Sequence, residues 1–351
     1  EQWSFDIQYR VSTHSVFEIG YNGNRGRKLL YGNPNLDADQ MPDQYLSLGP
    51  KLDSQVPNPF YGVADPSTYF GSVPTIAYNE MLRPYPEFTY LQWTRSLPGA
   101  RSAFDALEAK YNYRFSSGLN LLMTYQWSKA LDNGPEDYFG WATGNQWRDA
   151  YNTMLDYNIS THDIPQSFVT SLVYDLPYGK GKHWGSNAPA VLREALGNWQ
   201  VSTVITLQSG LPLYGLDWSP NNLLGNYGFP GPQMPDMVTY NVSPANRTPT
   251  NWLDPSAFAA PPSPYVLGNA PQRMTTMRER AERNVDLSVA KNFAGERYQV
   301  WLRGEFLNLF NYAQYNNVCL DLSDSSGCTF GTAYGTQNQP RTIQLSLKFM
   351  F

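Results

Sequence analysis

Strict alternation of apolar and polar residues is the feature of this sequence that most restricts its fold. At the C-terminus Ile343, Leu345, Leu347, Phe349 and Phe351 alternate with residues that are mostly polar. A strand exposes successive side chains on opposite faces, so this pattern predicts a strand with one apolar and one mostly polar face.

The same alternation recurs along the whole chain. It predicts nine strands, over residues 2–11, 16–22, 101–115, 119–129, 166–176, 199–209, 283–293, 297–312 and 341–351. The gaps between them run 4, 78, 3, 36, 22, 73, 3 and 28 residues, so shorter and longer connections alternate. Soluble sandwiches and propellers have no reason to place every long loop at one end, whereas outer-membrane barrels have short periplasmic turns and long extracellular loops. The sequence therefore predicts an all-β fold, an antiparallel transmembrane β-barrel.

Composition excludes several other classes. Aromatic residues make up 15% of the 351 residues and charged residues 16%, a mixture that suits strands and turns. The longest unbroken apolar run is four residues, 257–260, far short of the roughly 18 to 20 that a membrane helix needs. The net charge of −5 and the lack of a basic block argue against nucleic acid as a partner.

Aromatic residues cluster near the strand ends, where Tyr and Trp favour a membrane–water interface. The residues concerned are Trp3, Tyr21, Trp127, Trp199 and Tyr298. The alternative explanation is that aromatic residues simply favour strands.

The strand count predicts an incomplete barrel. Nine strands cannot close antiparallel, and closed bacterial single-chain barrels have even strand numbers. Glu1 already begins an alternating segment, without a signal-like start. We therefore expect residues 1–351 to be the C-terminal part of a longer barrel, preceded by further strands.

Six short segments, in this order, resemble the C-terminal barrel of Oar-like TonB-dependent outer-membrane receptors. They are residues 83–88 (RPYPEF), 125–132 (YQWSKALD), 176–181 (LPYGKG), 197–200 with 207–212 (GNWQ and LQSGLP), 284–288 (NVDLS) and 305–311 (EFLNLFN). The resemblance implies a 22-stranded barrel, with a plug, a TonB-contacting box and often a carboxypeptidase-regulatory-like domain that are absent from this chain. It also implies outer-membrane lipid, the TonB complex and the barrel assembly machinery as partners. Phe349 and Phe351, at the end of an alternating aromatic strand, resemble the signal that this machinery reads.

Loop aromatics are the candidate ligand-binding residues. The long loops contain Tyr138, Trp141, Trp147, Trp218, Tyr227 and Trp252. Flat aromatic rings among polar groups can stack on sugars or heterocyclic ligands, but they can equally pack the loops on one another. The substrate class stays open between an oligosaccharide, a siderophore and a peptide or protein.

Cys319 and Cys328 fall in the last long loop, close enough in sequence to be bridged. A protein that crosses the periplasm meets an oxidising environment, so we expect a disulfide, with two free thiols as the alternative.

The sequence offers no candidate for catalysis, a metal or a cofactor, and we expect no enzyme. Its three histidines are isolated, without a metalloprotease or nucleophile motif. Asn35, Asp37 and Asp39 begin like a calcium loop, but Gln40 and Leu46 stand where Gly and Glu are needed. The charged stretch 277–283 is explained better by a solvated loop or an ion network than by an anion site.

Three membrane functions remain, and a soluble lectin-like sandwich or enzyme is a distant fourth. The first is the barrel of an active receptor that imports a large substrate through its extracellular loops. The second is a structural or adhesion barrel without transport. A passive porin is disfavoured, because connections of 73 and 78 residues exceed what a simple pore needs.

Overall fold

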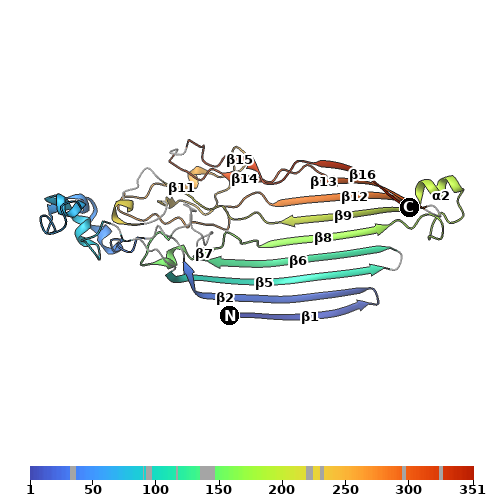
Figure 1. Cartoon of the computed structure of the whole chain (residues 1–351), viewed down its shortest axis with the longest axis horizontal. Helices are drawn as coiled ribbons and strands as arrows, with labels where there is room; N and C mark the ends of the chain where they lie inside the picture. The colour runs from blue at the N-terminus through green and yellow to red at the C-terminus, as the bar shows by residue number, and fades with distance from the viewer. Residues whose placement is uncertain are drawn as a thin grey trace.

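The computed structural model describes residues 1–31, 37–89, 91, 97–115, 118–134, 147–218, 224–229, 233–294, 298–323 and 327–351. Nine long strands form one curved antiparallel sheet (Figure 1). They are β1 (Gln2–Ser12), β2 (Ser15–Tyr31), β5 (Leu97–Phe115), β6 (Leu119–Asp132), β8 (Gln166–Asp175), β9 (Trp199–Gln208), β12 (Glu282–Ala294), β13 (Gln299–Leu307) and β16 (Thr342–Met350). All nine predicted strands are present.

Two strand boundaries differ from the sequence prediction by five residues or more. β2 continues to Tyr31 because Asn24 and Arg25 still pair with β5, in a segment whose Asn, Gly and Arg residues carry no apolar period. β13 ends at Leu307, because Asn308 takes a left-handed φ of 50° and its side-chain amide donates to the carbonyls of Tyr312 and Gln339.

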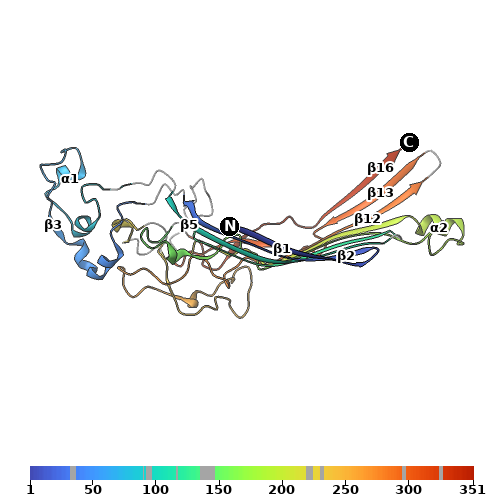
Figure 2. The ribbon, with the colours of Figure 1, turned by 90° about the horizontal axis from the view of Figure 1, so that it is seen from below.

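Each long strand pairs with the next one along the chain. The order is β1-β2-β5-β6-β8-β9-β12-β13-β16, and a short strand, β7 (Asn158–Ile159), adds to the end of β6. In this order β1 and β16 lie at the two edges of the sheet, and the described residues show no pairing between them. Seen from the side, β12, β13 and β16 rise away from the surface formed by β1 and β2 (Figure 2).

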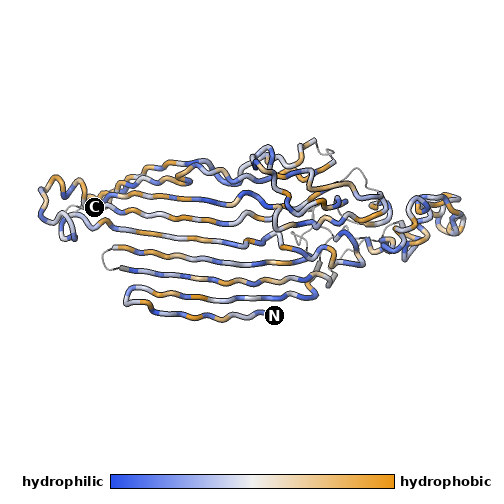
Figure 3. Tube along the Cα trace, turned by 180° about the vertical axis from the view of Figure 1, so that it is seen from behind, coloured by the Kyte–Doolittle hydropathy of each residue, from blue (hydrophilic) through white to orange (hydrophobic). Residues whose placement is uncertain are grey.

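The strand registers carry the predicted apolar residues onto one face of the sheet. One row of directly paired residues runs Ile7, Ile19, Ala109, Tyr125, Phe168 and Leu207 across six strands. The neighbouring row on the opposite face runs Gln8, Glu18, Lys110 and Thr124. Paired residues share a face, so the sheet has an apolar face and a polar face, and hydropathy alternates along every long strand (Figure 3).

The connections divide between the two ends of the sheet. Four connections, over residues 13–14, 116–118, 176–198 and 295–298, leave and re-enter the sheet at the end that we call the turn end. The third of them holds helix α2 (Ala190–Leu196) (Figure 1). Four longer connections, over residues 32–96, 133–165, 209–281 and 308–341, leave and re-enter the sheet at the opposite end, the loop end. The longest connections therefore gather at one end, as the sequence predicts.

Short elements stiffen the loop-end segments. They are β3 (Gln55–Pro57), α1 (Tyr69–Ser72), β4 (Thr75–Ala77), β10 (Asp236–Met237), β11 (Phe258–Ala259), β14 (Tyr315–Val318) and β15 (Ala333–Thr336), with 3₁₀ helices over Asp43–Asp53, Tyr78–Leu82, Thr153–Asp156 and Pro255–Ala257. β3 pairs with β4, β10 with β11, and β14 with β15. No helix in the described part of the chain has the length and apolar character to span a membrane.

Candidate functional site

The loop-end segments pack together into a body that we call the loop assembly. Its larger core joins residues from 209–281 with residues from 308–341, among them Leu216, Trp252, Met277 and Leu320. A second core joins Met41 and Leu52 with Leu224 and Tyr227, so the first and third long connections share buried surface. Burial of this many apolar side chains gives the loops a defined structure of their own.

Ion pairs link the segments of the loop assembly to one another and to the end of β6. Arg148 Nε lies 2.8 Å from Asp156 Oδ1, and the Arg148 guanidinium also donates to the carbonyls of Gly268 and Ala270. Arg273 lies 3.1 Å from Asp132 at the end of β6. Burial raises the pKa of Asp156, and the nearby Arg148 opposes that shift. Because these arginines are 1% to 7% exposed at their side chains, loss of the aspartate partner would leave a buried guanidinium unpaired.

Three long connections surround a hollow of about 680 Å³, which we call the loop hollow. Asp43 contributes from 32–96, Asn152 and Asn158 from 133–165, and Tyr240 and Asn269 from 209–281. Arg148 and Arg273 line the same hollow, but each is already beside an aspartate. The polar groups offered to a ligand are therefore mainly amides and hydroxyls, with a single further carboxylate in Asp43, and apolar side chains such as Leu155 and Met274 lie among them.

This chemistry suits a neutral polar ligand. Amides both donate and accept hydrogen bonds, and a tyrosine ring offers an apolar surface with a polar tip. Tyr240 is 70% exposed and Asn152 is exposed, so both side chains are accessible. The spacing of these residues in sequence gave no sign that they would meet, because they come from loops without periodic patterns.

The predicted ligand-binding aromatics have different positions. Trp147, Tyr227 and Trp252 are buried, and their polar atoms bond within the protein. The Trp147 and Trp252 indoles donate to the carbonyls of Asn133 and Arg278, and the Tyr227 hydroxyl donates to Asp53. Tyr227 and Trp252 pack the loops on one another, as the alternative interpretation has it, whereas Trp147 packs its loop against Ala100 of β5. Trp218 is partly buried, and its backbone N–H donates to the carbonyl of Gln233. Tyr138 and Trp141 lie outside the described residues.

Cys319 and Cys328 form a disulfide, with 6.1 Å between their Cα atoms. Cys319 is buried beside Val318 and Leu320, which belong to the larger core of the loop assembly. The bridge therefore anchors a surface loop to that core.

Phe349 and Phe351 lie at the turn end of β16, where Phe349 stacks on Tyr298 with ring centroids 6.3 Å apart. Both rings are exposed. Phe349 lies on the apolar face, and Phe351 is the last residue of the sequence. Their role as an assembly signal stays a prediction.

Asp37 and Asp39, in the segment that begins like a calcium loop, accept hydrogen bonds from the protein backbone. Asp37 Oδ1 accepts the backbone N–H groups of Asp39 and Leu91, and Asp39 Oδ1 accepts that of Tyr85. Asn35 lies outside the described residues. Across the described ranges, no group of three or more His, Cys, Asp or Glu side chains is placed to hold a metal ion.

The arginines of the charged stretch 277–283 make two kinds of interaction, ion pairing and contact with an aromatic ring. Arg278 pairs with Asp163 and donates to the carbonyl of Gly210, which fits an ion network. Arg280 instead places its guanidinium 3.9 Å from the Tyr312 ring centroid, and Arg283 lies 5.8 Å from the same ring. Within the described residues, neither Arg280 nor Arg283 has a carboxylate within 4.0 Å.

Comparison with known proteins identifies one family. A family model described as an outer membrane beta barrel domain matches residues 1–344. Curated protein sequences include no match.

Three solved structures match almost the whole chain. The unliganded ferric citrate transporter FecA is 11% identical with a TM-score of 0.39, and the match covers 99% of this chain and 30% of FecA. FpvA of P. aeruginosa, solved with a heterologous pyoverdine and iron, is 10% identical with a TM-score of 0.41, covering 99% and 26%. The siderophore receptor PiuA from Acinetobacter baumannii is 9% identical with a TM-score of 0.38, covering 99% and 35%. The chain thus spans between a quarter and just over a third of these proteins.

Proposed function

The chain belongs to the outer-membrane β-barrel domain family, and we propose that it forms part of the barrel of a TonB-dependent receptor of the Oar-like type. The protein is located in the outer membrane. Its apolar face is then the lipid face, its polar face lines the lumen, and the loop end is extracellular. The proposal assigns this chain recognition and import of a substrate and no chemical reaction.

The loop hollow is the observation that most directly supports a receptor that binds a substrate. A passive pore needs loops that leave its mouth open, whereas here three long connections fold around a shared hollow above the sheet. Pre-formed concave surfaces with a few accessible polar groups are typical of ligand sites. We propose that the substrate is a neutral oligosaccharide or peptide, because the arginines that line the hollow are already beside aspartates.

The test removes accessible side chains of the loop hollow. The double substitution Asn152→Ala and Tyr240→Ala should weaken binding of a neutral glycan or peptide, identified by screening arrays with the full-length protein. Loss of one stacking ring and one amide should weaken binding roughly tenfold or more. Tyr61→Ala is the matched control, since Tyr61 is a half-exposed tyrosine of the same loop assembly outside the hollow. Equal binding by all three proteins would place the ligand elsewhere.

Import separates the receptor from an adhesion barrel. Cells with and without functional TonB are compared for uptake of the fluorescently labelled array hit. Energy-dependent uptake supports the receptor. Surface binding without uptake in either strain would instead support a structural or adhesion barrel, the second candidate, which the large and well-packed loop assembly also favours.

A further inference from the structure

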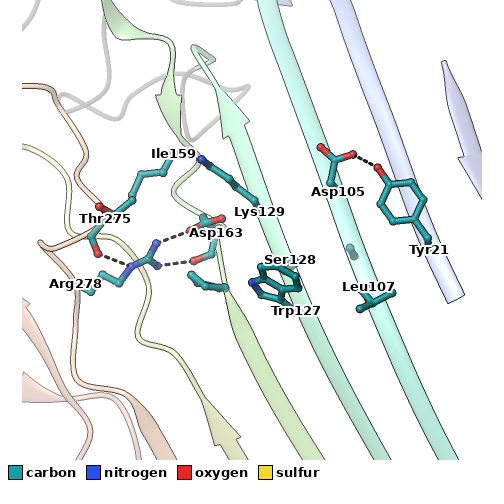
Figure 4. A pocket seen from close by; sticks show the side chains of 12 residues that line it. Tyr21, Asp105, Leu107, Trp127, Ser128, Lys129, Ile159, Asp163, Thr275 and Arg278 are labelled. Atoms are coloured by element: carbon teal, nitrogen blue, oxygen red, sulfur yellow. Dashed lines mark hydrogen bonds and ion pairs between the residues drawn. The ribbon is translucent and has the colours of Figure 1, made fainter. Parts of the chain in front are cut away.

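A second hollow, of about 560 Å³, lies against the sheet near the loop end, and we call it the rim hollow. The sheet lines it with Tyr21 of β2, Leu107 of β5 and Trp127 of β6 (Figure 4). The connection between β6 and β8 lines it with Ile159 and Pro165. The lining is predominantly apolar. The hollow is therefore suited to a hydrocarbon chain or another apolar group.

The rim hollow opens on the lipid face. Tyr21 pairs with Leu107 and Leu107 with Trp127, so the three side chains lie in one row of the apolar face. The next row toward the loop end contains Asp105 and its cross-strand partner Lys129. In a bilayer, the tyrosine and tryptophan mark the membrane interface, and the charged row lies at the level of the outer-leaflet headgroups.

Cations outnumber carboxylates around the rim hollow. Arg25 lies 2.7 Å from Asp105, and Arg278 pairs with Asp163, so these two cations are neutralised. Lys129 extends toward the hollow from β6 (Figure 4), it is exposed, and no carboxylate of the described residues lies within 4.0 Å of its ammonium group. The rim hollow therefore has one positive charge that the protein does not neutralise.

A second exposed cation of the apolar face lies in a separate, shallow depression. Arg283 of β12 pairs with Leu207 in the apolar-face row that contains Tyr125 and Phe168, and a shallow depression connects these residues. Arg283 also lacks a carboxylate within 4.0 Å among the residues described. Arg283 shares no lining residue with the rim hollow and lies two rows from Lys129 toward the turn end, so it lies outside the proposed binding site.

We propose that the rim hollow binds a phosphate-bearing lipid of the outer leaflet. An acyl chain lies over Tyr21, Leu107 and Trp127, and a phosphate group contacts Lys129. Two observations select this occupant: the apolar lining faces hydrocarbon, and the unneutralised charge beside it is positive. A soluble inorganic anion has no apolar group to bury against the apolar lining. The inference needs only the membrane location of the sheet and is independent of whether the barrel transports a substrate.

The experiment measures lipid binding to the full-length protein purified in detergent, by native mass spectrometry. The probe is lipid A, a phosphorylated acyl disaccharide, and the comparison probe is the same lipid without its phosphates. Lys129→Gln should weaken lipid A binding roughly fivefold, the effect of one cation near a membrane surface. Lys110→Gln is the matched control, because Lys110 is an exposed lysine of β5 on the polar face.

Each outcome is decisive once heat-modifiability shows that the variants are folded. Weaker binding by Lys129→Gln but not by Lys110→Gln, with little binding of the phosphate-free lipid, supports the proposal. Equal binding by both variants, or equal binding of both lipids, overturns it. Inorganic pyrophosphate is the last arm: competition at the same molar concentration as lipid A would show an anion site without lipid specificity and would also overturn it.

Discussion

Asp39 is a fully buried carboxyl group at a junction inside the loop assembly. One of its oxygens accepts the backbone N–H of Tyr85, and the other has no hydrogen-bond partner among the described residues. Burial raises the pKa of Asp39 to about 6, and the nearby Asp37 and Glu80 act in the same direction, while Arg83 opposes them.

The stability of this junction should therefore fall as the pH rises. A carboxyl whose folded-state pKa is raised favours the folded form fully below its unfolded pKa of about 3.9, and this contribution is lost as the pH rises through about 6. We expect hydrogen exchange in residues 37–41 and 83–89, corrected for intrinsic rates, to be faster at pH 7 than at pH 5. Asp39→Asn should reduce that difference, whereas Asp65→Asn, at an exposed aspartate, should leave it unchanged. An unchanged difference in Asp39→Asn would assign the effect to another group.

Leu345 and Ser346 are neighbours in β16 that point to opposite faces. Leu345 is 76% exposed on the apolar face, and Ser346 pairs with Arg303 on the polar face. Leu345→Arg should cost about 2 to 4 kcal/mol near the bilayer midplane, whereas Ser346→Arg should cost little. The fraction of heat-modifiable folded protein in outer membranes measures the difference. Equal losses would mean that the lipid and lumen faces have been assigned the wrong way round.

Residue-scale prediction from the sequence succeeds where periodicity exists. The alternation around Leu345, Phe5 and Tyr125 assigns each side chain to a face, because a period of two leaves only two choices. It does not succeed for Asp39 or Trp252. Their burial depends on contacts between loops that are far apart in sequence, and no local pattern reports such contacts.

At the scale of single elements, the disulfide between Cys319 and Cys328 is the clearest feature to test. The bridged loop leaves β14 and returns to the larger core through Phe330, which packs edge-on against Phe258. We expect both cysteines to be oxidised in the mature protein. Alkylation without reductant followed by mass spectrometry should recover a cross-linked peptide, and quantitative labelling of both thiols would refute the bridge.

The strands could be predicted as elements, but their full extents could not. Arg25 continues β2 beyond the apolar segment, because its guanidinium bonds Asp105 and the carbonyl of Phe104 on β5. At this position the side-chain hydrogen bonds of Arg25, and not an apolar face, explain why the strand continues. The loop hollow was beyond prediction for a related reason: Asn152 and Tyr240 meet only because two cores and several buried ion pairs fix three loops together.

At the scale of the whole molecule, the two sheet edges decide what the protein needs in order to be stable. Nine antiparallel strands make β1 and β16 parallel to each other, so these edges cannot join as a continuing antiparallel barrel. Each edge exposes a row of backbone N–H and C=O groups. In hydrocarbon every unpaired group costs several kcal/mol, which rules out an open edge inside a bilayer.

We therefore predict that further strands pair with β1 and β16 in the membrane, and that residues 1–351 alone do not form a stable barrel. The exposed apolar side chains of β1, Phe5, Ile7 and Tyr9, strengthen this expectation, because they need a complete lipid-facing wall around them. Residues 1–351 refolded in detergent should give aggregates or oligomers without a heat-modifiable band, while the full-length protein gives a folded monomer. A monodisperse, heat-modifiable monomer of residues 1–351 would contradict the prediction, and would require β1 and β16 to be covered in a way that the antiparallel pairing pattern does not provide.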